Sequence, residues 1–366
     1  MKITAVEAIP VKIPLLEPLH WVTGYMEHAE HVLVRIKTDE GIEGISEAVP
    51  RPGIYGETPA SIIYLINSVF SPLLIGLDPF DTEKIWNKMS AVYWNPSAKS
   101  SIDIALWDIM GKKCCMPCYK LMGGWTDKVQ VSWMIALKSM KEMVADAEKS
   151  YSEGFRYFKL KGGIDPDFDI DMVRNIKKVV GLDAKLYIDG NMGYNYLGIL
   201  KVAKALSDDL VWLEEPMQCW DGPGRKKLSE HTDIPLLGDE SLFTLSSTAH
   251  EIALGALDII MVKIPRTGFT MGKKYVALAE AHNKPMLIGT QAETTLGTTA
   301  CIHFAAAHKQ FSLSNELSYF KSINGNLLTT DITIDNGYIS VPQGAGMGVE
   351  LDEEKVKYFS DLAKNA

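Results

Sequence analysis

Charged residues recur at regular intervals in the second half of the sequence, each one directly after a short apolar run. About 25 residues separate one run from the next, which is enough for one strand, one helix and two loops. This repeat predicts a (β/α) barrel, in which the C-terminal ends of the parallel strands meet around one mouth. Residues far apart in the sequence therefore converge there. The apolar runs cover residues 155–160, 186–188, 210–213, 235–237 and 258–262.

The charged residues that follow one apolar run are called a station below. Three of the stations are acidic and two are basic. Side chains two apart in a strand share a face, so Asp189 points with Asn191. Glu214 and Glu215 cannot both face the same site, and alternation alone leaves the choice between them open. Together with Asp239, these carboxylates supply the hard oxygen ligands that Mg²⁺ prefers, and Mn²⁺ would fit too. Zinc is disfavoured because none of the eight histidines has ligand spacing.

The basic stations predict proton transfer. Lys159 and Lys161 share a strand face, and two close ammonium groups beside a divalent cation each disfavour the other's charged form. A lysine with a lowered pKa is a base at neutral pH. Lys263 comes from a strand beyond the acidic ones and would address the opposite face of a bound substrate. Proton abstraction next to a carboxylate gives an enediolate, whose charge a divalent ion can stabilise.

Length allows a second domain beside the barrel. The chain has 366 residues, and a barrel of this kind takes about 250. Alternating strands followed by helical segments predict an α+β domain over residues 1–125. Residues 126–320 would form the barrel, with its first strand at 129–136 and its eighth at 311–313. Residues 321–366 contain a hairpin signal at Asn336-Gly337, and we expect them to return to the first domain, which would cap the barrel mouth.

Composition excludes several classes of protein. The net charge of −9 and the lack of a basic stripe argue against nucleic acid as a partner. No apolar run reaches membrane-spanning length, and the first residues alternate like a strand instead of forming a signal peptide. These features predict a cytoplasmic protein that does not act at a membrane. Five cysteines, an odd number, predict reduced thiols and not a disulfide framework.

These motifs closely resemble the enolase superfamily, specifically the muconate lactonizing enzyme subgroup of the mandelate racemase/muconate lactonizing enzyme family. The resemblance covers essentially the whole chain. It rests on Lys159-Leu-Lys161-Gly-Gly, Ile188-Asp189-Gly-Asn191, Leu213-Glu214-Glu215-Pro216, Gly238-Asp239-Glu240-Ser241 and Val262-Lys263-Ile264, together with Ser101-Ile-Asp-Ile-Ala-Leu-Trp-Asp-Ile-Met-Gly111. It implies a (β/α)₇β barrel with an α+β capping domain that the C-terminal tail completes.

The resemblance also assigns roles to the stations. It implies Mg²⁺ on Asp189, Glu214 and Asp239, and so selects Glu214 over Glu215. Lys161 and Lys263 would be the acid/base pair. Lys159 would tune or orient Lys161. Supporting roles would fall to three further side chains, Asn191, Glu240 and Glu293.

Specificity in such relatives depends on two loops that close over the mouth, here residues 19–26 and 50–57. Trp21, Tyr25 and Tyr55 could enclose a quaternary or cyclic amine by cation–π contact. Glu316 is a further candidate substrate contact. The segment that ends at Glu316 lacks the Asp-x-Asp of dipeptide epimerases, which argues against that activity. A second departure is at Gly268-Phe269, where relatives often have two adjacent glycines.

The predicted function is abstraction of the proton alpha to a carboxylate by a Mg²⁺-dependent enzyme. The predicted enzyme class is an isomerase, either a cycloisomerase or a racemase or epimerase of an amino-acid derivative. The alternative is a lyase, a dehydratase that uses the same enediolate. The partner would be a small carboxylate substrate. Relatives are commonly homo-oligomers, so the resemblance implies one here. A sugar-cleaving carboxylate pair on an unrelated barrel is a further reading.

Overall fold

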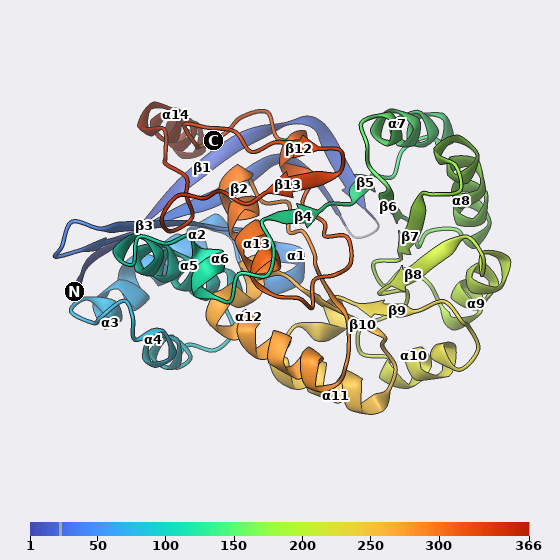
Figure 1. Cartoon of the computed structure of the whole chain (residues 1–366), viewed down its shortest axis with the longest axis horizontal. Helices are drawn as coiled ribbons and strands as arrows, with labels where there is room; N and C mark the ends of the chain where they lie inside the picture. Colours follow the sequence, from blue (N-terminus) through green and yellow to red (C-terminus); the bar gives the residue numbers. More distant parts are fainter. Residues whose placement is uncertain (22–23, 366) are drawn as a thin grey trace.

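The computed structural model describes residues 1–21 and 24–365. An antiparallel sheet in the order β1-β2-β3 forms the start of the capping domain, at the left of Figure 1. Its strands are β1 (Ile3–Trp21), β2 (Gly24–Thr38) and β3 (Glu43–Ala48). Helices then follow: α1 (Pro52–Tyr55), α2 (Pro59–Tyr64), the π-helix η1 (Leu65–Phe70), α3 (Ser71–Leu74), α4 (Thr82–Met89), α5 (Pro96–Lys113) and α6 (Cys118–Leu121).

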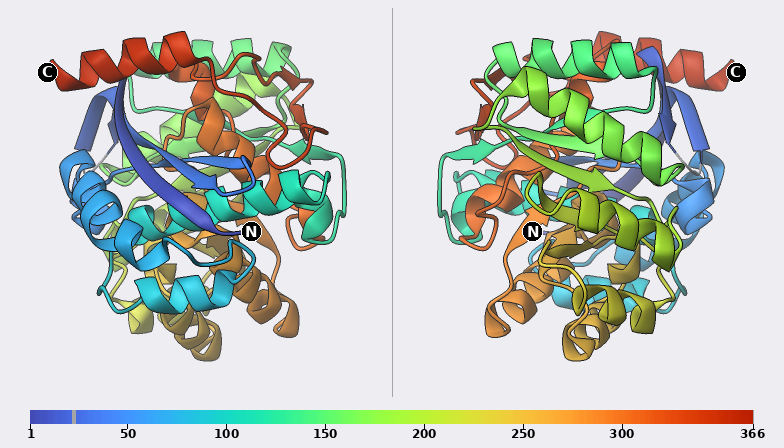
Figure 2. Two further views of the ribbon diagram at one scale, coloured as in Figure 1. Left: turned by 90° about the vertical axis from the view of Figure 1, so that its left-hand side faces the viewer. Right: turned by 90° about the vertical axis from the view of Figure 1, so that its right-hand side faces the viewer.

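The predicted barrel is present as a curled parallel sheet in the order β5-β6-β7-β8-β9-β10-β11. The strands are β5 (Trp133–Ile135), β6 (Tyr157–Lys161), β7 (Lys185–Asp189), β8 (Leu210–Glu214), β9 (Leu236–Gly238), β10 (Ile259–Val262) and β11 (Met286–Ile288). Helices cover the outer face of the sheet (Figure 2). They are α7 (Met140–Ser152), α8 (Pro166–Val180), α9 (Tyr196–Ala205), α10 (Gly222–Ser229), α11 (Leu245–Leu254), α12 (Ile264–Ala281) and α13 (Thr295–Ala307), with the 3₁₀ turns η2 (Glu240–Leu242) and η3 (Tyr319–Ser322).

The eighth strand predicted at 311–313 is wrong. The barrel closes instead through Asn315, which makes an isolated parallel bridge with Val131. The Asn315 side chain accepts a hydrogen bond from the backbone N–H of Ile288 at 2.8 Å, in the position that a strand carbonyl would take. Ser132 N–H donates to the Asn315 carbonyl at 2.8 Å on the other side. A side chain thus completes part of the ladder.

The first predicted barrel strand, 129–136, is divided in two. β4 (Lys128–Gln130) leaves the barrel and pairs with the C-terminal hairpin, and only β5 enters the curled sheet. The hairpin strands are β12 (Ile334–Asp335) and β13 (Tyr338–Ser340), joined as predicted at Asn336-Gly337, where both φ angles are positive (48° and 75°). The last helix, α14 (Glu353–Lys364), packs against β1 of the capping domain (Figure 1).

Strand alternation sorts the barrel side chains into two layers. One buried cluster fills the barrel interior, and its core members are Tyr187, Trp212, Leu237, Ile259, Met261 and Leu287. The intervening residues pack outward against the helices. Side chains two positions after an interior residue point the same way and reach the mouth. Asp189, Glu214 and Asp239 therefore follow Tyr187, Trp212 and Leu237.

Two capping-domain carboxylates accept backbone N–H groups at the starts of barrel helices. Glu47 of β3 accepts from Thr294 and Gly297 at the start of α13, both at 3.0 Å. Asp103 of α5 accepts from Phe269 and Thr270, which begin the second part of α12 after its break at Gly268. Both side chains are buried. Helix N-termini favour negative charge, so these contacts dock the capping domain onto the barrel.

Among the residues that the structure describes, no helix is both long and apolar enough to cross a membrane.

Candidate active site

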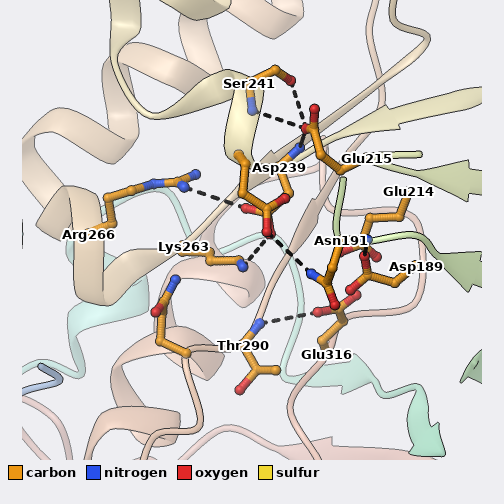
Figure 3. Close-up of polar contacts among 12 residues, drawn as sticks. Asp189, Asn191, Glu214, Glu215, Asp239, Ser241, Lys263, Arg266, Thr290 and Glu316 are labelled. Carbon is orange, nitrogen blue, oxygen red and sulfur yellow. Dashed lines mark hydrogen bonds and ion pairs between the residues drawn. The ribbon is translucent and has the colours of Figure 1, made fainter. Parts of the chain in front are cut away.

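The predicted stations meet at the C-terminal ends of adjacent strands. Asp189 is the last residue of β7 and lies in register with Lys161 on β6 and Glu214 on β8. Asp239 follows β9 directly, and Lys263 follows β10. Figure 3 shows the acidic side chains and Lys263 pointing toward one another. The register of the parallel strands therefore gathers acidic and basic groups from residues 159 to 263 into one buried site.

Lys159 is the buried centre of this charge cluster. Its ammonium group lies 2.7 Å from Glu214 Oε1, 2.8 Å from Glu316 Oε1 and 3.0 Å from Asp189 Oδ2. Burial alone would lower the pKa of Lys159, but these carboxylates outweigh burial and raise that pKa well above its usual range. For Lys159, the predicted lowering of the pKa is therefore wrong, because acidic neighbours and not Lys161 dominate its surroundings. Lys159 therefore keeps its positive charge at neutral pH and contacts all three carboxylates.

Lys161 reaches the mouth one pleat above Lys159. Its ammonium group donates to Asp189 Oδ2 at 2.6 Å and to Asn191 Oδ1 at 2.8 Å. The amide of Asn191 donates in turn to Glu240 at 3.2 Å. Burial and the nearby Asp239 raise the pKa of Glu240 to about 8. Asn191 thus links the Lys161 side of the site to Glu240.

Lys263 occupies the other side of the acidic group. Its ammonium group is paired with Asp239 Oδ2, while the Arg266 guanidinium lies 3.4 Å from Asp239 Oδ1. Burial opposes ionisation of Asp239, but the two cations outweigh burial and hold its pKa below the usual range. In the same way, burial lowers the pKa of Lys263 and the carboxylates of Asp239 and Glu240 more than restore it, so that this pKa is raised.

The structure distinguishes Glu214 from Glu215. Glu215 Oε2 accepts hydrogen bonds from the backbone of Asp239 (2.7 Å) and from the backbone and hydroxyl of Ser241 (3.0 and 2.8 Å), and Glu215 Oε1 faces Arg225. Its carboxylate is committed to the loop after β9 (Figure 3). Glu214 faces the cluster instead, and its Oε2 is buried without a hydrogen-bond partner. Burial and the Asp189 carboxylate raise the pKa of Glu214 well above its usual range.

The chemistry of the acidic group fits a divalent cation. Three carboxylates from adjacent strand ends provide hard oxygen donors, and Glu214 Oε2 is a buried donor that lacks a partner. The lysine ammonium groups now lie among these oxygens, and in the described part of the chain no three acidic, histidine or cysteine side chains are already gathered as an ion-binding cluster. The donor set fits Mg²⁺ or Mn²⁺ when the carboxylate oxygens are shared between the cation and the lysine ammonium groups.

A cavity of about 300 Å³ lies above the lysines, between the barrel and the capping domain. Lys161, Lys263, Asn191 and Glu240 form its floor. Its remaining walls come from both predicted lid segments and from barrel loops: Leu19, Met26, Arg51, Gly53, Ile54, Met134, Met192, Cys219, Phe243, Thr290, Gln291, Ala292 and Tyr319. A neighbouring depression of about 510 Å³ between β1 and α7 shares Leu19, Met134 and Tyr319 with it but holds none of the predicted site residues.

The structure does not bring the predicted substrate contacts together. Tyr25 is 67% exposed and lines an adjoining depression on the capping domain, which shares Met26, Arg51, Gly53 and Ile54 with the cavity but contains neither Lys161 nor Lys263. Tyr55 is buried, and its hydroxyl accepts a hydrogen bond from Gln291 at 2.6 Å. Glu316 lies beneath the site against Lys159 and Tyr187. The side chain of Trp21 lies outside the described residues.

Glu293, a predicted supporting residue, lies away from the acidic cluster. Its carboxylate accepts hydrogen bonds from the Thr290 hydroxyl at 2.7 Å and the Gln291 backbone at 2.6 Å. It therefore shapes the loop after β11. Arg51, Phe243 and Tyr319 line the cavity and were not identified from the sequence. Arg51 lies inside the predicted lid segment 50–57, and this position was the one sequence signal for a contact with the cavity. Nothing in the sequence pattern favoured Arg51 over its neighbours in that segment.

Comparison with known proteins agrees with this geometry. Residues 3–123 match the model of the mandelate racemase/muconate lactonizing enzyme N-terminal domain, and residues 142–355 match that of the enolase C-terminal domain-like family. The chain is 32% identical to L-Ala-D/L-Glu epimerase of Bacillus subtilis, over 95% of this chain and 97% of the epimerase.

Two solved structures are also similar. The muconate lactonizing enzyme of Mucobacterium smegmatis in complex with muconolactone has a TM-score of 0.95 and 36% identity, covering 98% of this chain and 99% of that one. The N-succinyl Arg/Lys racemase of Bacillus cereus has a TM-score of 0.94 and 28% identity, covering 98% of each chain. This chain belongs to the mandelate racemase/muconate lactonizing enzyme family of the enolase superfamily. That family is enzymatic, and the named relatives are isomerases.

Replacement of Lys159 should destabilise the fold. In Lys159→Met, three buried carboxylates lose their shared cation, and we expect a loss of about 3–5 kcal/mol in the free energy of unfolding. Urea denaturation at pH 7 without divalent cations measures it. Lys201→Met removes a lysine whose ion pair with Asp167 is exposed and should change nothing measurable. A loss below about 1 kcal/mol in Lys159→Met would show that Lys159 is not the balancing charge.

Proposed function

We propose that this protein is a metal-dependent isomerase that moves a proton at the carbon alpha to a carboxylate. The observation that carries the proposal is the placement of Lys161 and Lys263 on either side of the acidic strand ends. β6 and β10 are separated in the sheet by the strands of Asp189, Glu214 and Asp239, and both lysines line one cavity. Lys161 Nζ would take or return the proton on one face of the substrate, and Lys263 Nζ on the other. Such an arrangement suits 1,1-proton transfer, the chemistry of a racemase or epimerase.

The three carboxylates would hold Mg²⁺ or Mn²⁺, and Glu214 Oε2, buried and without a partner, supports this assignment. When bound, the cation supplies a positive charge that stabilises the negative charge formed as the alpha proton leaves. Lys159 keeps Glu214 and Asp189 in place from below. Asn191 holds Lys161 from the side and fixes the direction of its ammonium group.

Charge in the cavity supports a substrate with a second acidic group. Apart from the two lysines, Arg51 is the cation among the described lining residues, and Glu240 is the carboxylate. Glu240 lies on the floor of the cavity, where it accepts a hydrogen bond from Asn191. Among the described lining residues, the capping domain therefore contributes a cation and apolar groups but no anion that could bind a free ammonium group. We therefore propose an N-acylated amino acid whose acyl group ends in a carboxylate, or another dicarboxylate. N-succinyl amino acids are the model compounds.

Deuterium exchange tests the reaction. We expect wild-type enzyme with Mg²⁺ in D₂O to exchange the alpha proton of both enantiomers of an N-succinyl amino acid, as measured by NMR. Lys161→Ala should abolish exchange of one enantiomer and Lys263→Ala that of the other, because each lysine serves one face.

A library of N-acetyl amino acids, dipeptides and muconates extends the same experiment. Loss of starting material to an alkene or a 2-keto acid would replace the isomerase by a lyase. Exchange that persists for both enantiomers in both lysine variants would contradict the two-lysine assignment.

Metal binding is tested apart from activity. Glu214→Gln should weaken Mg²⁺ binding by at least about tenfold in isothermal titration calorimetry, because a neutral amide replaces an anionic donor. Glu293→Gln serves as the control, since that carboxylate is bonded to the loop after β11 and should not alter the affinity. Equal affinities in wild type and Glu214→Gln would remove Glu214 from the ligand set.

Arg51→Met tests the substrate class. Loss of a charge-assisted hydrogen bond should raise KM for an N-succinyl substrate by about 10- to 100-fold, with a smaller effect on the N-acetyl counterpart. Steady-state kinetics on the two substrates measure the difference. Lys138→Met, a cation at the neighbouring depression, is the matched control and should leave the ratio unchanged. An equal rise for both substrates would assign Arg51 to domain docking, through its bond to the Gln291 carbonyl.

A further inference from the structure

Helix α12 is broken five residues after Lys263. Gly268 has φ 63° and ψ −172°, which interrupts the helix and leaves a short turn that carries Lys263 and Arg266. The Lys263 carbonyl accepts from the N–H groups of Arg266 (2.9 Å) and Thr267 (3.0 Å) within this turn. The rest of α12 begins at Phe269. The turn can therefore move relative to the long helix unless something else fixes the break.

Asp103 of the capping domain fixes the break. Its Oδ2 accepts hydrogen bonds from the backbone N–H groups of Phe269 at 2.7 Å and Thr270 at 2.9 Å. These are the first free N–H groups of the second half of α12. A Cβ atom at Gly268 would lie 2.5 Å from the same oxygen, so only glycine permits this approach. Asp103 is buried, and burial raises its pKa to about 6, which leaves it ionised at neutral pH.

Two more side chains of α5 hold the same segment. The Ser100 hydroxyl donates to the Pro265 carbonyl at 2.5 Å, before the break. Trp107 Nε1 donates to the Thr270 hydroxyl at 3.0 Å, after the break. α5 and α12 pack together more extensively than any other pair of helices described, and Figure 1 shows them side by side. The three contacts bracket the turn on both sides of Gly268.

We propose that Asp103 is a positioning residue for Lys263, so that the capping domain sets the geometry of one of the two acid/base lysines. This inference rests on the proposed function, in which Lys263 serves one face of the substrate. It separates two tasks of the capping domain: the lid segments shape the cavity, whereas α5 aligns a reacting group on the barrel. Lys161 lies on β6, and within the described part of the chain its ammonium group donates to Asp189 and Asn191 and not to α5, so it should not depend on Asp103.

Three variants separate positioning from general stability. Asp103→Ala removes the acceptor for both N–H groups. Asp103→Asn keeps an acceptor oxygen of the same size and should restore the alignment. Asp108→Ala is the matched control on the same helix, because Asp108 is buried and accepts from Met347 (2.7 Å) and Ile45 (2.9 Å) instead of α12.

Enantiomer-resolved exchange gives the first readout. For Asp103→Ala with N-succinyl amino acids in D₂O, exchange should fall by about 100-fold for the enantiomer that Lys263→Ala abolishes, and by less than about threefold for the other. Asp108→Ala should affect both enantiomers equally, and Asp103→Asn should recover most of the lost rate. Equal losses for both enantiomers in Asp103→Ala would overturn the inference.

Competitive acetylation with acetic anhydride gives a readout without substrate. Mass spectrometry of the peptides should show Lys263 labelled at least about fivefold faster relative to Lys161 in Asp103→Ala, since the turn then exposes a side chain that is 9% exposed in the folded protein. An unchanged ratio, or the same change in Asp108→Ala, would overturn the inference. If the wild type exchanges no library compound, the proposed reaction fails, while the labelling still decides the role of Asp103.

Discussion

The buried ammonium group of Lys159 is the charge on which the mouth of this barrel depends. Asp189 and Glu214 end neighbouring strands, and Glu316 follows the bridge at Asn315. All three are buried, and their mutual repulsion would be severe without a shared counter-charge. Lys159 contacts all three. Its position on β6 follows from the same strand alternation that places Lys161 one pleat higher. The strand that supplies a predicted acid/base group therefore also supplies the cation that allows the acidic site to be buried.

Period and register determine where the charged residues after each strand lie, so the strand pattern is enough to predict that they converge at one mouth. An interior residue such as Tyr187 or Trp212 is followed two positions later by a site residue, and this rule needs only the strand pattern. The choice between Glu214 and Glu215 was beyond that rule. It depends on Ser241 and Arg225, whose positions are decided by the loop after β9 and by α10.

The cavity walls and the ends of the barrel were less predictable. Tyr25 and Tyr55 were chosen by chemical type, but the hairpin turns Tyr25 to solvent and a hydrogen bond fixes Tyr55 behind Gln291. The eighth strand failed because Asn315 closes the ladder with its side chain, which no propensity indicates. Long-range docking decided these outcomes, and local patterns carry little information on it.

The capping domain meets the barrel largely through helix starts. Glu47 and Asp103 come from different elements of that domain, yet each presents a carboxylate to free N–H groups of a barrel helix. Arg51 adds a third link through the Gln291 carbonyl. Under the proposed function, substrate selection through Arg51 and the placement of Lys263 through Asp103 would share this one interface.

The closure of the barrel at Asn315 has a consequence for how the chain folds. Ser132 and Asn315, which meet across the seam, are 183 residues apart in the sequence. Contacts of such long range must wait until the intervening strands have paired, because the entropy of closing the loop is recovered only then. Few hydrogen bonds join Asn315 and its neighbours to the two edge strands of the barrel, and in one of them the Ile288 N–H donates to the side chain of Asn315 instead of to a backbone carbonyl. We expect the seam to form after the parallel ladder of the barrel and to open before that ladder under mild denaturation.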